Sequence, residues 1–464
     1  MGDRALGADR AVEAVFREEH GRLLASLVRR FGDLDLAEEA ASEAIEAALV
    51  HWPERGVPER PGAWLLTTAR RRAVDRLRRD RAYAARLGVL RAEAERAEPA
   101  PPADAGTGTG ADLPDDRLRL FFTCAHPALP DEVRGALVLR CLAGLTTPEV
   151  ARAYLVPTAT VAQRIVRAKK KISQARVPFR VPGPDELPER LPGVLQVLYS
   201  LFTEGYAASS GPDLQRPELA GEAIRLTRIL RRLLPAQREV TGLLALMLLV
   251  HARREARTGP GGEMVMLAEQ DRGRWDRAMI DEGLALVPAA LTGGPPGPYG
   301  VQAAVAALHD EAPDLATTDW PQIAALYDVL LGLDPSPVVA LNRAVAVAMR
   351  DGPAAGLALL DALVDGRPGP PDGGSGDRAD GRRLRAYHPF HAARADLLER
   401  LGRREEAARS YRRALELAGT AAERTRLRRV LDALEAPPRP DGARAHRSGG
   451  TDVRPVGADG PGGP

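Results

Sequence analysis

The chain has 464 residues, of which 44% are hydrophobic and only 4% aromatic, and its formal net charge is +2. This length exceeds what one hydrophobic core usually holds, so roughly two to four domains are expected. The small net charge excludes a global electrostatic attraction to nucleic acid, and any cationic binding surface must therefore be local.

Apolar residues recur at spacings of three and four along most of the chain, which predicts an all-α protein. Cys124 and Cys141 are too few for a disulfide framework or, by themselves, for a zinc site, and they suit a reducing cytosol. The first residues, MGDRALGADRAV, lack the apolar core of a signal peptide. The longest apolar run, Thr241 to Ala252, is too short to cross a bilayer. We therefore expect a cytoplasmic protein that does not contact the membrane.

Changes in composition divide the chain into helical units and joints. A first unit is expected at 10–82, a flexible linker rich in Pro, Gly, Ala and acid at 83–114, a second unit at 115–176, a helical extension at 187–434 and a disordered tail at 435–464. The proline-rich joint from Arg176 to Gly193 is expected to let the extension fold independently, and the Gly/Pro-rich segment from Asp365 to Gly381 is expected to be a disordered insertion.

The first unit contains an expected amphipathic helix from Asp33 to Glu54. Its buried stripe is predicted to consist of small and apolar side chains: Leu36, Ala40, Ala44, Ala47 and Ala48. Its other face carries Glu38, Glu39, Ser42, Glu43 and Glu46. Such a face is usually only solvated, but a basic surface of a partner protein could dock there.

A second expected helix, from Ala63 to Arg81, combines an apolar face that includes Trp64 with a dense row of arginines. The cationic side chains are Arg70, Arg71, Arg72, Arg76, Arg78 and Arg79. Arginine at this density suits a nucleic-acid backbone or a single strand, with electrostatics as the main contribution to affinity.

The segment from Leu145 to Ile172 predicts a helix-turn-helix, with Thr147 as cap of the first helix, a break at Pro157 and Thr158 as cap of the second. The start of the second helix supplies the candidate base readers Thr158, Ala159, Thr160, Ala162, Gln163 and Arg164. Arg167, Lys169 and Lys170 follow as candidate phosphate contacts. The alternative is an ordinary helical hairpin with a solvated basic face.

These three segments, in this order, resemble the extracytoplasmic-function sigma factors, the smallest initiation factors of bacterial RNA polymerase. DLAEEAASEAIEAALVHW is similar to their region-two helix, which docks on the clamp coiled coil of the β′ subunit. AWLLTTARRRAVDRLRR is similar to their helix at the minus-ten promoter element, and LTTPEVARAYLVPTATVAQRIVRAKKKI to their region-four helix-turn-helix at the minus-thirty-five element. The resemblance implies promoter DNA and core polymerase, through its β′ clamp and β flap, as partners.

One departure from the family pattern is Arg71, which stands where many relatives have an asparagine that helps hold a flipped promoter base. Trp64 and the arginine row are the implied minus-ten contacts. The acidic residues of the preceding helix are the implied polymerase contacts.

The extension resembles the subgroup whose C-terminal part contains tetratricopeptide repeats. Residues His388 to Gly419 carry small or apolar residues at that spacing, and Ser336 to Leu363 is an imperfect second copy. Such arrays usually bind a protein or peptide in a concave groove. The alternative is a structural cap packed on the sigma core.

No phosphate loop, zinc-protease helix, nucleophile elbow or dinucleotide fingerprint occurs, so we expect no enzyme, no cofactor and no metal. Cys124 and His126 are interpreted as structural residues. The predicted function is a sigma factor that binds core RNA polymerase and directs promoter-specific initiation under the control of its extension. The alternatives are a conventional helix-turn-helix regulator and a repeat scaffold that does not bind polymerase.

Overall fold

The computed structural model describes residues 19–91, 116–154, 156–208, 211, 213–365 and 384–436. Throughout this part of the chain the regular structure is helical, and β-pairing is limited to two isolated bridges, Gly211 with Thr420 and Thr258 with Met264. The predicted all-α class is confirmed. None of the described helices combines the length and apolarity that a membrane crossing requires.

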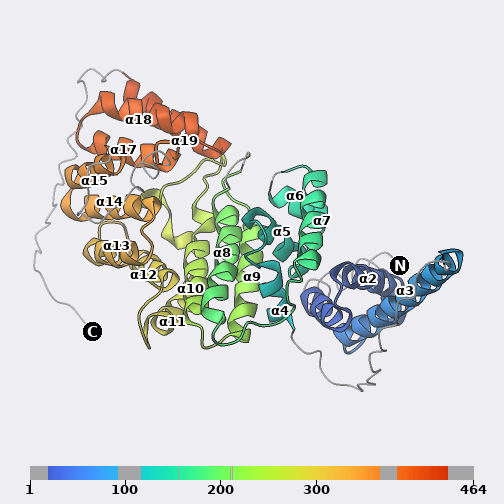
Figure 1. Cartoon of the computed structure of the whole chain (residues 1–464). Helices are drawn as coiled ribbons and strands as arrows, with labels where there is room; N and C mark the ends of the chain where they lie inside the picture. Colours follow the sequence, from blue (N-terminus) through green and yellow to red (C-terminus); the bar gives the residue numbers. More distant parts are fainter. Residues whose placement is uncertain are drawn as a thin grey trace, which may run out of the picture.

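The first unit consists of a helix over residues 19–31, α2 (Leu34–Arg55) and α3 (Pro61–Arg91). Asp33 caps α2, because its carboxylate accepts hydrogen bonds from the backbone N–H groups of Asp35 and Leu36 at 2.8 and 3.0 Å. The predicted stripe of α2 is buried except for the half-buried Ala47. Small side chains on this stripe let α2 pack closely against α3 (Figure 1).

Helix α3 continues to Arg91, well past residue 82, where the flexible linker was expected to begin. The residues that follow Arg81, AYAARLGVLR, are mostly good helix formers and contain no proline, so nothing local stops the helix. The linker prediction is therefore wrong for residues 83–91. Its remainder, 92–114, lies outside the described residues.

The second unit consists of α4 (Arg117–Cys124), α5 (Asp131–Cys141), α6 (Thr147–Ala153) and α7 (Thr158–Gln174), the last two forming the expected helix-turn-helix. Both expected caps are wrong by one residue. Thr146 precedes α6 and exchanges two hydrogen bonds with Glu149. The N–H of Thr146 donates to the Glu149 carboxylate at 2.7 Å, and the hydroxyl of Thr146 accepts from the N–H of Glu149 at 3.4 Å. Pro157 precedes α7 with no side-chain cap, so Thr158 is the first helical residue.

The extension is a chain of helical hairpins that starts beside the second unit (Figure 1). Its helices are α8 (Leu187–Tyr206), α9 (Pro217–Leu233), α10 (Arg238–Ala252), α11 (Arg277–Leu291), α12 (Pro298–Glu311), α13 (Trp320–Leu333), α14 (Pro337–Asp351), α15 (Pro353–Asp365), α17 (His388–Arg400), α18 (Arg404–Leu417) and α19 (Ala421–Glu435). The segment expected as a disordered insertion lies, except for Asp365 at the end of α15, outside the described residues.

The extension shares a hydrophobic core with the second unit, contrary to the expectation that it folds independently. Helix α8 packs on α4 and α5, and one continuous cluster contains Leu24 of the first helix, Leu137 of α5 and Leu198 of α8. Arg190 also donates a 3.1 Å hydrogen bond to the carbonyl of Phe122. The proline-rich joint therefore turns the chain back onto the helix-turn-helix unit.

The far end of the extension has a second core, formed by α14 to α19. The hairpins α14–α15 and α17–α18 turn at glycines with positive φ, Gly352 (99°) and Gly402 (76°). Helix α19 returns to the extension's beginning, where Ala421 N–H donates to the carbonyl of Gly211 at 3.1 Å. The two hairpins coincide with the expected repeats, whose tetratricopeptide nature stays a prediction.

Candidate nucleic-acid and polymerase surfaces

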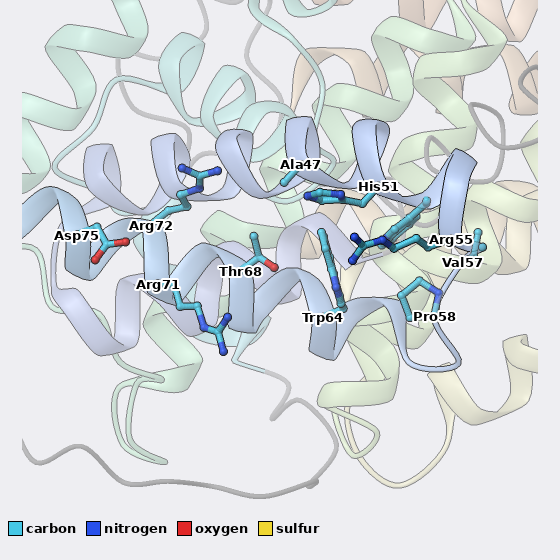
Figure 2. Close-up of a pocket in the computed structure, with 12 residues that line it drawn as sticks. Ala47, His51, Arg55, Val57, Pro58, Trp64, Thr68, Arg71, Arg72 and Asp75 are labelled. Carbon is cyan, nitrogen blue, oxygen red and sulfur yellow. The ribbon is translucent and has the colours of Figure 1, made fainter.

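A pocket of about 640 Å³ lies between α2 and α3, where the two helices diverge toward their connecting loop (Figure 2). Helix α2 contributes His51 and Arg55 to its wall, and α3 contributes Trp64, Thr68 and Arg71. The indole of Trp64 is half-buried, and it meets the buried ring of Trp52 edge-on with centroids 5.5 Å apart. This contact fixes the orientation of Trp64 against the wall of the pocket.

The pocket combines flat aromatic rings with cationic side chains. His51 stands edge-on to Trp64, at a centroid distance of 6.4 Å. The exposed Arg71 makes no ion pair with the described residues. An aromatic face stacks on a base regardless of its identity, and a guanidinium can stack on the base or bind the adjacent phosphate. The pocket therefore has the chemistry that an unstacked nucleotide requires.

The arginine row of α3 is partly neutralised by α2. Arg76 forms an ion pair with Glu39, and Arg72 lies 3.7 Å from Glu43. Arg78 is 3.9 Å from Asp75 on its own helix. Of the predicted cationic residues, Arg70, Arg71 and Arg79 are exposed and without an acidic partner among the described residues.

Arg70 lines a second, smaller pocket of about 190 Å³ together with Ser26, Arg29 and Arg30. Burial, and then the charges of Arg30 and Arg29, lower the pKa of Arg70. This concentration of positive charge favours an anionic group beside the start of the cationic face.

The predicted acidic face of α2 does not form one surface. Glu39 and Glu43 face the arginines of α3, whereas Glu38 points to the second unit and is only 12% exposed. Ser42 and Glu46 are exposed and lack partners within the described part of the chain. A polymerase that approaches the free chain would therefore meet only part of the predicted surface.

The predicted base readers lie together at the start of α7. Thr158, Ala159 and Gln163 are exposed, and Thr160, Ala162 and Arg164 are half-buried. Among the candidate phosphate contacts Arg167 and Lys170 are exposed, but Lys169 is only 12% exposed. Val161, Ile165 and Ala168 are buried on the opposite side of α7, which directs the reader side outward.

Lys169 contacts α2 directly, which the sequence did not predict. Its Nζ lies 2.7 Å from Asp35 Oδ1 and 2.6 Å from Glu38 Oε2. Burial alone would lower the pKa of Lys169, but the charge of Glu38 and the hydrogen bonds to both carboxylates outweigh it, and the pKa is raised. Arg140 of α5 also approaches Glu38, at 3.6 Å.

The cysteines lie beneath this contact. Both are buried and free, as expected for Cys124, and His126 is half-buried. A hydrogen bond with Cys124, together with burial, raises the pKa of the Cys141 thiol. The described residues contain no group of His, Cys, Asp or Glu side chains that could hold a metal ion.

His51 and Arg55 of the pocket were missed as functional residues. The signal available in the sequence was the spacing of HW at positions 51–52 and AW at positions 63–64, which places aromatic residues at both ends of one interhelical loop. The contacts of Lys169 and Arg140 with Glu38 had no local signal, because they join residues about a hundred or more positions apart.

Three families match separate parts of the chain: Sigma-70 region 2 at residues 16–83, Sigma-70, region 4 at residues 122–172, and a family of unknown function (DUF6596) at residues 190–291. The chain is also 43% identical over 416 residues to the uncharacterized protein R00370 of Rhizobium meliloti (strain 1021), a match that covers 89% of this chain and 94% of that protein. No solved structure matches the chain.

Proposed function

The chain belongs to the sigma-70 family: it is a sigma factor that binds RNA polymerase and DNA and that carries a C-terminal extension, and we propose that it directs transcription initiation at a small set of promoters. The observation that carries this proposal is the aromatic and cationic pocket between α2 and α3, within the region-2 match. A pocket of this chemistry is needed where a promoter base leaves the duplex, but not for binding to closed DNA.

At the minus-ten element, the flipped base enters the pocket and stacks on Trp64. Arg71 takes the place of the asparagine of many relatives, and it holds the base edge or the neighbouring phosphate. Arg70, Arg78 and Arg79 supply phosphate contacts along α3, while Arg72 and Arg76 remain paired to α2 until DNA or polymerase displaces their carboxylates.

At the minus-thirty-five element, the start of α7 enters the major groove. Gln163 and Arg164 read base edges, and Arg167, Lys169 and Lys170 bind phosphates. Alanine at a base reader is expected to cost roughly 1–3 kcal/mol at one promoter position and to relax its preference. Alanine at Lys170 should weaken all promoters alike and lower the salt slope by about one unit. A base-selective effect at Lys170 would mean that the readers are assigned to the wrong side of α7.

The acidic residues of α2 dock on the polymerase clamp. In the free chain Ser42 and Glu46 are already accessible to the clamp, whereas Glu38, Glu39 and Glu43 are paired with other side chains. Reversing Glu38, Glu39 and Glu43 together would also break the ion pairs with α3 and the second unit, so Glu46→Lys is the cleaner test. It should weaken core polymerase binding without changing the melting temperature. Glu405→Lys, on the exposed surface of α18, makes the same charge change far from α2 and serves as the control. Equal polymerase affinity of the two variants would contradict docking through α2.

The extension controls initiation by bracing the second unit. The packing of α8 on α4 and α5 supports this role, since the orientation of the helix-turn-helix depends on the core beneath it. A protein or peptide bound by the α14–α19 hairpins would act on initiation through the same core.

Run-off transcription with purified core polymerase and fragmented genomic DNA tests the proposal. The expected result is a limited set of transcripts that require this protein, and their start sites give the promoter sequence. Sequence-specific DNA binding without transcripts would support the conventional regulator instead.

A further inference from the structure

We propose that the free chain holds itself in a closed state in which Lys169, near the end of the recognition helix α7, is paired with Asp35 and Glu38 of α2, and that core polymerase must displace α7 to reach Glu38. This inference rests on the proposed function, because it assigns Glu38 to polymerase and Lys169 to DNA. Neither residue can serve its partner while the two are paired with each other.

The contact is centred on Glu38. Its two carboxylate oxygens lie 2.6 Å from Lys169 Nζ and 3.6 Å from Arg140 Nε, and the thiol of Cys141 lies 3.7 Å away. Asp35 approaches the same ammonium group at 2.7 Å. With Glu38 and Lys169 each only 12% exposed, water screens their attraction much less than it screens an ordinary surface pair.

A second ion pair joins the two units with the opposite polarity. Arg29 of the first unit lies 3.3 Å from Asp116, at the start of α4. Each unit thus presents an acid to a base of the other, at two separate places. Such complementarity in both directions fixes one relative orientation and disfavours others.

Backbone contact accompanies the ion pairs. A Cβ on Gly21 would lie 2.9 Å from the carbonyl oxygen of Leu142, and a Cβ on Gly144 would lie 3.0 Å from the ring of His20. His20, near the start of the described part of the first helix, is only 5% exposed. Residues from both units belong to one hydrophobic cluster, so the ion pairs lie at the edge of a packed interface.

The consequence is competition for one surface. A polymerase segment that binds Glu38 must first release Lys169, and Lys169 then becomes available to a DNA phosphate. The apparent affinity for polymerase therefore equals the intrinsic affinity multiplied by the fraction of molecules that are open.

Carbodiimide crosslinking tests the closed state directly, because the reagent couples an amine to a carboxylate only when the two are in contact. In the free full-length chain, mass spectrometry should find Lys169 joined to Glu38 or Asp35. The crosslink should disappear once saturating core polymerase is bound. Its absence from the free chain, or its persistence in the holoenzyme, would overturn the proposal.

Affinity for core polymerase provides the second measurement. Lys169→Ala should bind about five- to tenfold more tightly than the unaltered chain, because it shifts the population toward the open state. Asp35→Asn should shift it in the same direction by less, since Asp35 is largely exposed. Lys171→Ala, an exposed residue of the same helix, removes an equal charge outside the contact and serves as control.

The outcomes separate this inference from the function on which it rests. If polymerase binds all variants equally, the function stands and the closed state is wrong. If neither the unaltered chain nor any variant binds polymerase while the unaltered chain still forms the crosslink, the proposed function fails, and with it the competition. Circular dichroism and thermal unfolding of each variant confirm that the comparison is between folded proteins.

Discussion

Replacing Trp64 with alanine should impair promoter opening much more than it impairs folding. Stacking of one base on an aromatic side chain stabilises a complex by about 1–3 kcal/mol, so the equilibrium constant for opening should fall by roughly 5- to 150-fold. The lost edge-on contact with Trp52 is worth only about 0.5–1.5 kcal/mol beyond the area that both rings bury. Since Trp52, a buried residue of α2, is itself unchanged, the unit should remain folded.

The assay is the fluorescence of 2-aminopurine placed in the minus-ten element of a promoter recovered by run-off transcription. Each holoenzyme is compared at equal occupancy of the promoter, so that opening is measured separately from capture. Trp64→Phe keeps an aromatic face and should retain most of the signal. If the Trp64→Ala holoenzyme opens the promoter to the same extent as the unaltered one, no promoter base stacks on this residue.

Three other predictions concern stability. Burial, reinforced by neighbouring arginines, lowers the pKa of three histidines to about 4: His20, His251 and His309. The unfolded chain, whose histidines titrate near 6.5, therefore binds more protons between pH 6.5 and 4, and stability should fall as the pH drops through that window by up to about 3 kcal/mol per histidine. Urea unfolding at pH 7.5 and 5 measures this, and equal midpoints would contradict it. Truncation after Pro178 removes α8 from α4 and α5, so thermal unfolding and gel filtration should show a destabilised, associating protein; a soluble fragment with unaltered promoter output would contradict this. Gly242→Val should destabilise the chain by about 1–3 kcal/mol in chemical denaturation, because a Cβ there would lie 2.6 Å from the backbone nitrogen of Gly300; Gly332→Ala, with open space around it, should be neutral.

The helices of the candidate site could be predicted because their signals are local. Asp33 stands at the start of α2, where its carboxylate accepts hydrogen bonds from the first turn, and the alanine stripe repeats at helical spacing. Pro157 separates the two helices of the helix-turn-helix. In each case the residues that determine the structure lie within a few positions of one another.

The partners of charged residues could not be predicted in the same way. The local sequence around a glutamate is the same in kind whatever surrounds its side chain in the fold. Glu46 is solvated, Glu39 is paired with the next helix, and Glu38 is enclosed by the second unit. The choice depends on the tertiary approach of α3 and α7. The packing of α8 on α5 escaped prediction for the same reason, since a proline-rich joint specifies a break in the helix but not the direction that the chain takes afterwards.

The pairing of opposite charges inside the chain also connects the two binding events. Lys169 and Glu38 neutralise each other in the free chain, so each proposed surface is withheld by the other. In the proposed competition, polymerase that binds Glu38 frees Lys169 for phosphate, and DNA that binds Lys169 frees Glu38 for polymerase. By thermodynamic linkage the two effects are equal: whatever factor polymerase adds to promoter affinity, promoter DNA adds to polymerase affinity. A chain with a net charge of only +2 can then remain a weak DNA binder by itself and become a strong one in the holoenzyme, without any change in its total charge.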